Sequence, residues 1–121
     1  MTSRNRRDAL PITAPDGSTI HEFLNPRNSV LQNQSLAQAT LAPGQSTSEH
    51  LHPRAEEIYF ILRGRGRMKI EETLFEVSEG DAIPIPPGQK HRIWNVDESG
   101  ELVFLCCCAP AYADEDTILS E

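Results

Sequence analysis

Four side chains in two short stretches of the sequence have the types and spacing of metal ligands. His50 and His52 lie one residue apart in "EHLHPRAEE", Glu57 ends that stretch, and His91 begins the later stretch "HRIWNV". Residues i and i+2 of a strand point to the same side, so the paired histidines project together, and Glu57 can enter from the next strand. Three imidazoles and one carboxylate converging inside a barrel form a nitrogen and oxygen site that suits Mn, Fe, Co, Ni, Cu or Zn.

The elements that must position these residues are predicted to be short β-strands. Nine prolines and seven glycines break the 121 residues into short runs, with turn signals about every 8 to 12 residues, as in sandwiches and small barrels. The strands expected are residues 18–24, 31–41, 56–64, a hairpin over 67–78, 90–96 and 101–109. We therefore predict an all-β sandwich or barrel with little or no helix.

The chain is predicted to hold one globular domain with a short extension. Residues 1–17 are polar and end in the turn signal "PDG", so we expect a flexible N-terminal tail, followed by a single barrel domain over 18–121. The last dozen residues are acidic and are expected to wrap the surface.

Charge and composition exclude several kinds of partner. A net charge of −7 offers no basic face for nucleic acid. No stretch approaches the roughly 20 apolar residues that cross a bilayer, and no apolar segment follows the N-terminal arginines, so no secretory signal is predicted. Cys106, Cys107 and Cys108 are consecutive and odd in number. This argues against structural disulfides and favours a cytoplasmic location. Cys106 or Cys108 could reach the interior of the barrel, and we expect these two to be small core residues.

Two longer motifs frame the four candidate ligands. The first is "GQSTSEHLHPRAEEIYFILRG" over residues 44–64, and the second is "GDAIPIPPGQKHRIWN" over residues 80–95. Both match the two motifs of the cupin superfamily, so the chain resembles a small single-domain cupin. The resemblance implies a double-stranded β-helix, or jelly-roll barrel, with one divalent metal ion (Fe, Mn, Ni or Zn) held by His50, His52, Glu57 and His91. Glu56, the rival carboxylate, is expected to point outward, and Asn95 to hold a neighbouring turn.

The alternation around Glu57 predicts the two faces of its strand. Tyr59 and Ile61 should share the inner face with Glu57, whereas Ile58, Phe60 and Leu62 should form an apolar outer face, to which Trp94 is expected to add. An apolar face of this kind is predicted to be covered, either by the N-terminal strands or by a second subunit, and a homodimer is the expected outcome. The candidate pocket walls are Tyr59, Gln38, Met68 and Ile93, and Tyr59 is the candidate catalytic residue because it alone carries an acid–base hydroxyl.

Two functions remain open at the level of sequence. The first is a metal-dependent enzyme, a dioxygenase or an isomerase or lyase, that acts on a small oxygenated organic substrate. The alternative is a cupin that binds a metal or a small ligand without chemistry. The fold does not decide between them, because this barrel supports many chemistries.

Overall fold

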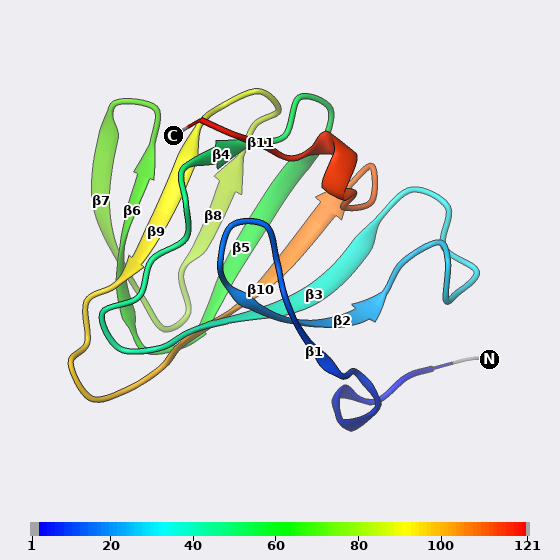
Figure 1. The fold of residues 1–121 in the computed structure, drawn as a ribbon, viewed down its shortest axis with the longest axis horizontal. Coiled ribbons are helices and arrows are strands. Elements are labelled where there is room, and N and C mark those ends of the chain that lie inside the picture. The colour runs from blue at the N-terminus through cyan, green and yellow to red at the C-terminus, as the bar shows by residue number, and fades with distance from the viewer. Residues whose placement is uncertain (1–2, 121) are drawn as a thin grey trace.

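The computed structural model describes residues 3–120, and they form two antiparallel sheets packed face to face (Figure 1). The six-stranded sheet has the order β1-β2-β3-β10-β5-β8 and the five-stranded sheet the order β11-β4-β9-β6-β7. The strands are β1 (Pro11–Thr13), β2 (Thr19–Leu24), β3 (Ser35–Leu41), β4 (His50–Leu51), β5 (Glu56–Arg63), β6 (Arg65–Ile70), β7 (Thr73–Ser78), β8 (Ala82–Ile85), β9 (His91–Asn95), β10 (Leu102–Ala109) and β11 (Ile118–Leu119). The predicted all-β double-stranded β-helix is confirmed.

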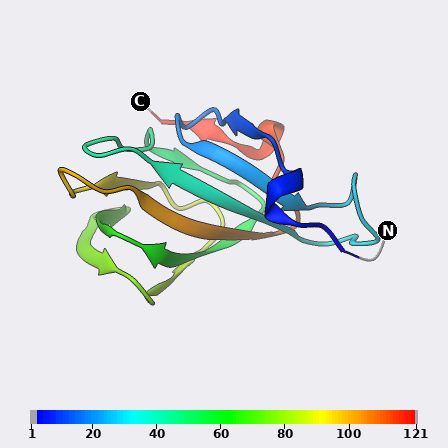
Figure 2. The same ribbon diagram turned by 90° about the horizontal axis from the view of Figure 1, so that it is seen from below.

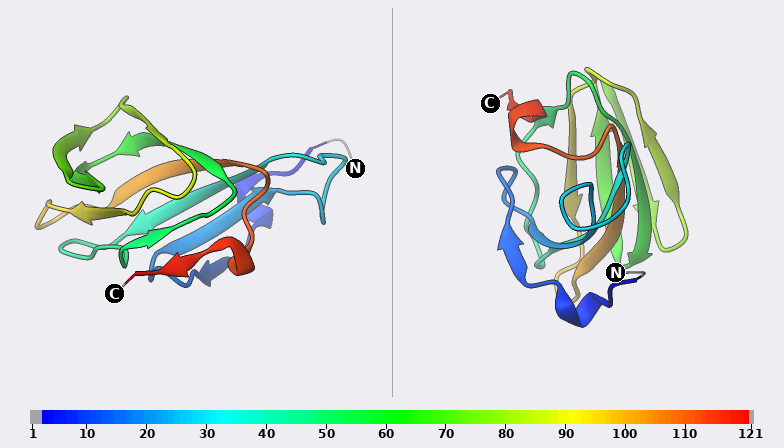
Figure 3. Two further views of the ribbon diagram at one scale, coloured as in Figure 1. Left: turned by 90° about the horizontal axis from the view of Figure 1, so that it is seen from above. Right: turned by 90° about the vertical axis from the view of Figure 1, so that its right-hand side faces the viewer.

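The helical content of the described residues is two short 3-10 turns, η1 (Arg6–Asp8) and η2 (Asp114–Asp116). No helix within residues 3–120 is long and apolar enough to cross a bilayer. Figures 2 and 3 show that the first strands (blue) and the last segment (red) lie close together on one side of the barrel.

The core lies between the two sheets, where alternate residues of each strand meet. Its fully buried members include Leu41, Ile61, Met68, Ile93, Leu102 and Phe104. The predicted phase of β5 is confirmed, because Glu57, Tyr59 and Ile61 are buried while Ile58, Phe60 and Leu62 are 48%, 39% and 39% exposed. Burial of this apolar surface stabilises the barrel by about 25 cal/mol for each Å² removed from water.

Glycine is required at the turn between β5 and β6. Gly64 has a φ of +97°, and a Cβ built there would lie 2.5 Å from the carbonyl oxygen of Glu101. Both the positive φ and the close backbone approach exclude larger residues. This turn carries the chain from β5 of one sheet directly into β6 of the other.

The N-terminal segment takes part in the six-stranded sheet. β1 pairs with β2, with Ile12 opposite Ile20, so strand pairing begins before the predicted domain start at residue 18. Flexibility of residues 1–17 stays a prediction, and residues 1 and 2 lie outside the described part of the chain.

The predicted position of Trp94 beside the apolar face of β5 is wrong. Trp94 lies on β9 of the five-stranded sheet, and the Arg92 guanidinium stacks 4.9 Å from its ring centroid. The alternation placed its side chain outside the barrel, but alternation alone does not tell which sheet a strand joins.

Candidate metal centre

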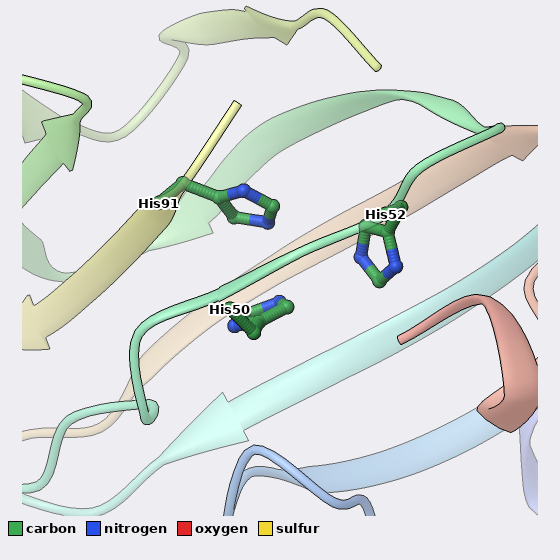
Figure 4. A group of neighbouring side chains, drawn as sticks. All are labelled: His50, His52 and His91. Carbon is green, nitrogen blue, oxygen red and sulfur yellow. The ribbon is translucent and has the colours of Figure 1, made fainter. Parts of the chain in front are cut away.

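The three histidines of the two motifs meet on neighbouring strands. His50 of β4 and His91 of β9 are directly opposite partners in the five-stranded sheet, and His52 follows β4 two residues after His50. Their ring centroids lie 4.2 Å (His50–His91), 5.1 Å (His50–His52) and 5.4 Å (His52–His91) apart. One ligand nitrogen from each ring lies within 4.8 Å of the other two, and Figure 4 shows the rings gathered around one space.

Each imidazole is oriented by a main-chain carbonyl. Nδ1 lies 2.8 Å from the oxygen of Ser48 for His50, 3.0 Å from that of Gln89 for His91, and 3.2 Å from that of Asp116 for His52. A carbonyl can only accept, so Nδ1 must carry the proton in each neutral ring. The Nε2 lone pair is thereby left for the centre, which is the usual arrangement of histidines that bind metals.

Glu57 projects from the inner face of β5 toward the same space. Its Oε1 lies 3.3 Å from Nε2 of His52 and 3.5 Å from Nε2 of His91, and its Oε2 accepts a hydrogen bond from Cys108 Sγ at 3.3 Å. Burial opposes ionisation, but the adjacent imidazoles of His52 and His91 outweigh it and lower the pKa of Glu57 to about 2. The carboxylate is therefore charged at neutral pH.

The polar atoms at this point fit a bound cation. Glu57 Oε1 and His91 Nε2 are buried and have no hydrogen-bond partner, since neither close approach has the geometry of a hydrogen bond. Buried polar atoms without partners are costly in a folded protein. Three imidazole nitrogens and a carboxylate oxygen match the ligand preferences of divalent transition metals, so these residues are positioned for a metal site.

The pKa values of His50 and His52 are shifted in opposite directions by their surroundings. Burial, followed by the neighbouring His91, lowers the pKa of His50. Burial also disfavours the charged form of His52, but contact with Glu57 outweighs this effect and raises the pKa of His52 above 6.5. His52 is therefore the histidine of this pair that competes more strongly for a proton.

A cavity of about 100 Å³ opens beside the histidines. Its walls come from β1 to β3, from β5 and β10, and from the C-terminal segment. The polar lining residues include Asp16, Glu22, Tyr59, Cys106, Cys108 and Asp114. Both terminal segments thus contribute to the site, which the sequence analysis did not foresee.

Asp16, in the turn between β1 and β2, is a site residue that the sequence analysis missed. Its Oδ2 lies 3.7 Å from Nε2 of His50, and its Oδ1 accepts hydrogen bonds from the amide and hydroxyl of Ser18. The Ser48 amide donates to the carbonyl of Asp16. The sequence signal was the turn "PDG", which locates a turn but not its tertiary contacts.

The C-terminal segment is the second part of the site that was missed. The Asp116 carboxylate accepts hydrogen bonds from the amides of Arg54 and Ala55, both at 3.1 Å, and β11 pairs with β4. Thr117 Oγ1 lies 3.3 Å from Nδ1 of His52. The C-terminal acidic segment therefore holds residues 50–55, which include His52, in place.

Tyr59 lies on the cavity wall, where it was expected. Its ring packs 4.6 Å from Phe104 and 6.0 Å from His91, measured between centroids. Burial, with the nearby Glu57, raises the pKa of Tyr59 well above its usual value. The phenol is accordingly protonated at neutral pH and can donate a hydrogen bond.

The other predicted wall residues lie elsewhere. The prediction that Gln38 lines the pocket is wrong, because its side chain faces the outside of β3 and accepts a hydrogen bond from Arg6 Nε. The inner face of that strand carries Ala37 and Ala39. Met68 and Ile93 are core residues that do not line the cavity. The expected role of Asn95 agrees with the structure, since Nδ2 donates to the carbonyls of Leu41 and Gly100.

The three consecutive cysteines are free and alternate in direction. Cys106 and Cys108 line the cavity, and Cys107 lies opposite Ile58 on the other face. Burial, with the nearby Glu57, raises the thiol pKa of Cys106 and Cys108. Both are therefore neutral thiols, and Cys108 acts as a hydrogen-bond donor to Glu57.

Comparisons with known proteins agree with the motifs. The family model described as "Cupin domain" matches residues 37–108. Uncharacterized protein MJ1618 of Methanocaldococcus jannaschii is 44% identical over 111 residues, which cover 92% of this chain and 88% of that protein.

Two solved structures share the fold at low identity. The Streptomyces protein Pac13, described as a unique nucleoside dehydratase, has a TM-score of 0.82 at 14% identity, covering 100% of this chain and 92% of its own. A predicted oxalate decarboxylase from Thermotoga maritima has a TM-score of 0.77 at 23% identity, covering 91% of this chain and 99% of its own. At such identities the likeness concerns the fold alone.

Proposed function

The chain belongs to the cupin family, as its two motifs predicted, and we propose that it is a metal-dependent enzyme acting on a small oxygenated organic substrate. The reaction would be of the dioxygenase or the isomerase or lyase type. One observation carries the proposal: three Nε2 atoms and the Glu57 carboxylate converge beside a cavity, and two of these buried atoms have no hydrogen-bond partner.

The residues of the centre would bind one divalent transition metal ion, Fe, Mn, Ni or Zn. Carbonyl groups at Nδ1 fix the ring orientation of His50, His52 and His91, and the Cys108 thiol holds Glu57. When bound, such an ion would supply a Lewis acid for a substrate oxygen.

Tyr59 is the candidate catalytic residue of this chain. It lines the cavity on the inner face of β5, two residues from Glu57. Because its phenol stays protonated, Tyr59 would donate a hydrogen bond to a substrate oxygen and orient it. Phe104 packs against its ring and restricts that orientation.

Elemental analysis of protein purified without added metal tests the proposal. We expect one metal ion per chain in the wild type and loss of most of it in His52→Ala and His91→Ala, because each removes a nitrogen donor. Wild-type metal content in both variants would contradict the assignment.

Oxygen uptake with enediols, diketones and thiols as substrates would then identify a dioxygenase. Turnover without oxygen would identify an isomerase or lyase, and bound metal without turnover would favour the binding protein.

We further propose that the chain forms a homodimer through the outer face of β5. Ile58, Phe60 and Leu62 are partly exposed there, and on β10 Leu105 and Cys107 lie opposite Phe60 and Ile58. Contiguous apolar surface of this kind marks association sites.

The three free cysteines support a reducing compartment such as the cytoplasm.

A further inference from the structure

The charges that face the cavity point to its ligand class. Four of its lining residues are carboxylates, Asp16, Glu22, Glu57 and Asp114, and no lysine or arginine lines it among the described residues. His50 and His52 also line the cavity, but their ring nitrogens face the metal position. An anionic substrate would therefore have the metal ion as its single attractive charge.

The negative charge exceeds what a divalent ion neutralises. Four carboxylates carry −4, and a divalent ion reduces this to −2. Arg27 lies 3.9 Å from Glu22 and offsets part of its charge. Asp114 is exposed, so solvent screens its charge.

Asp16 is the least exposed of the three lining carboxylates that are not candidate metal ligands, because Glu22 is 27% exposed and Asp114 lies at the surface. Its side chain is 15% exposed, and Oδ2 lies 3.7 Å from Nε2 of His50. Ser18 donates two hydrogen bonds to Oδ1, so the side chain is held in place with Oδ2 toward the cavity. Glu57 Oε1, buried and without a hydrogen-bond partner, shows that the same space is arranged for positive charge or for donors.

We propose that the cavity takes an uncharged or cationic small molecule whose hydroxyl or amino group donates to Asp16, and that it discriminates against small carboxylates and phosphates. The discrimination follows from Coulomb repulsion, which is strong at a few ångströms in a poorly solvated site. This inference rests on the proposed function of the same cavity. It makes oxalate a poor ligand of this chain, although a cupin of the same fold is described as a predicted oxalate decarboxylase.

Titration calorimetry with two probes of nearly equal shape tests this inference. Glycolate and glycolamide share a hydroxyl and differ in charge, so the ratio of their affinities measures the preference of the cavity. In Asp16→Asn we expect glycolate to bind on the order of tenfold more tightly relative to glycolamide. Asp16→Asn/Asp114→Asn should extend the change, whereas Glu98→Gln, at an exposed position outside the cavity, should leave the ratio unchanged.

An Asp16→Asn variant with an unchanged ratio, or with weaker glycolate binding, would overturn the inference. Metal content is measured on the same samples, so that the two proposals can fail separately. Protein without metal would contradict the proposed metal centre, while the four carboxylates would still disfavour glycolate. Folding of each variant is checked by its thermal unfolding profile.

Discussion

The ring Nδ1 of His52 lies 3.2 Å from the main-chain oxygen of Asp116, 64 positions further along the chain. The same aspartate caps the amides of Arg54 and Ala55 through its side chain. The turn between two candidate ligands, His52 and Glu57, is therefore held by a segment close to the C-terminus. The metal centre is not a property of the two motifs alone.

Asp116→Ala should weaken metal binding although Asp116 is not a candidate ligand. Loss of the carboxylate frees two amides and allows the turn after His52 to shift, and groups that orient ligands typically contribute about 10- to 100-fold in metal affinity. Competition with a chelating dye measures the change. Glu115→Ala, an exposed neighbour in the same turn η2, is the matched control and should bind metal like the wild type.

Glu57→Gln and Glu56→Gln should differ sharply. Glu57 is 5% exposed and reaches His52 and His91. Glu57→Gln removes the negative charge from the one carboxylate among the four candidate metal ligands, and should lower metal affinity by at least about tenfold. Glu56 points to solvent and its variant should change little. A larger loss in Glu56→Gln would mean that the register of β5 differs by one residue from the structure.

The candidate ligands could be predicted because their information is local. His50 and His52 form an i, i+2 pair, so their side chains point to the same side of a strand. Glu57 follows five residues after His52, and a Pro-x-Gly turn precedes His91. Their spacing also matches a known family, so the fold and the convergence of the four side chains followed together.

The rest of the site depends on tertiary contacts that leave no local pattern. Asp16 reaches His50 because the β1–β2 turn hydrogen-bonds to Ser48, and Asp116 reaches His52 because β11 pairs with β4. Gln38 was predicted to line the pocket, but its side chain lies on the other face of β3 and binds Arg6. A shift by one residue reverses every side chain of a strand.

Stabilisation of the fold by metal should increase as the pH rises from about 5.5 to 7.5. The pKa of His52 is raised above 6.5 by Glu57, so the protonated ring stabilises the metal-free fold below pH 6.5, and that contribution is lost as the pH rises through the raised pKa. Metal needs the neutral ring, so protons compete with it at low pH. The difference in Tm with and without Zn²⁺, measured across this range, tests the expectation.

His21→Gln is the control for this pH dependence. His21 lies on β2, opposite Gln38 and outside the cluster, and its loss should leave the profile of the Tm difference unchanged. A Tm difference that stays constant between pH 5.5 and 7.5 would argue against histidines as the metal-binding groups.

Phe60→Glu should convert a homodimer into a monomer, or into insoluble protein if the face stays partly apolar. Burial of the outer-face side chains Ile58, Phe60 and Leu62 together with their neighbours would remove a few hundred Å² of apolar surface, which is worth several kcal/mol at roughly 25 cal/mol per Å². Association entropy offsets much of this gain, so one buried charge is enough to shift the equilibrium. Leu74→Glu, at an exposed apolar position on β7 of the other sheet, should remain dimeric. Sedimentation equilibrium gives the mass directly. A wild-type chain with a mass of 13.5 kDa at high concentration would show that this face needs no partner.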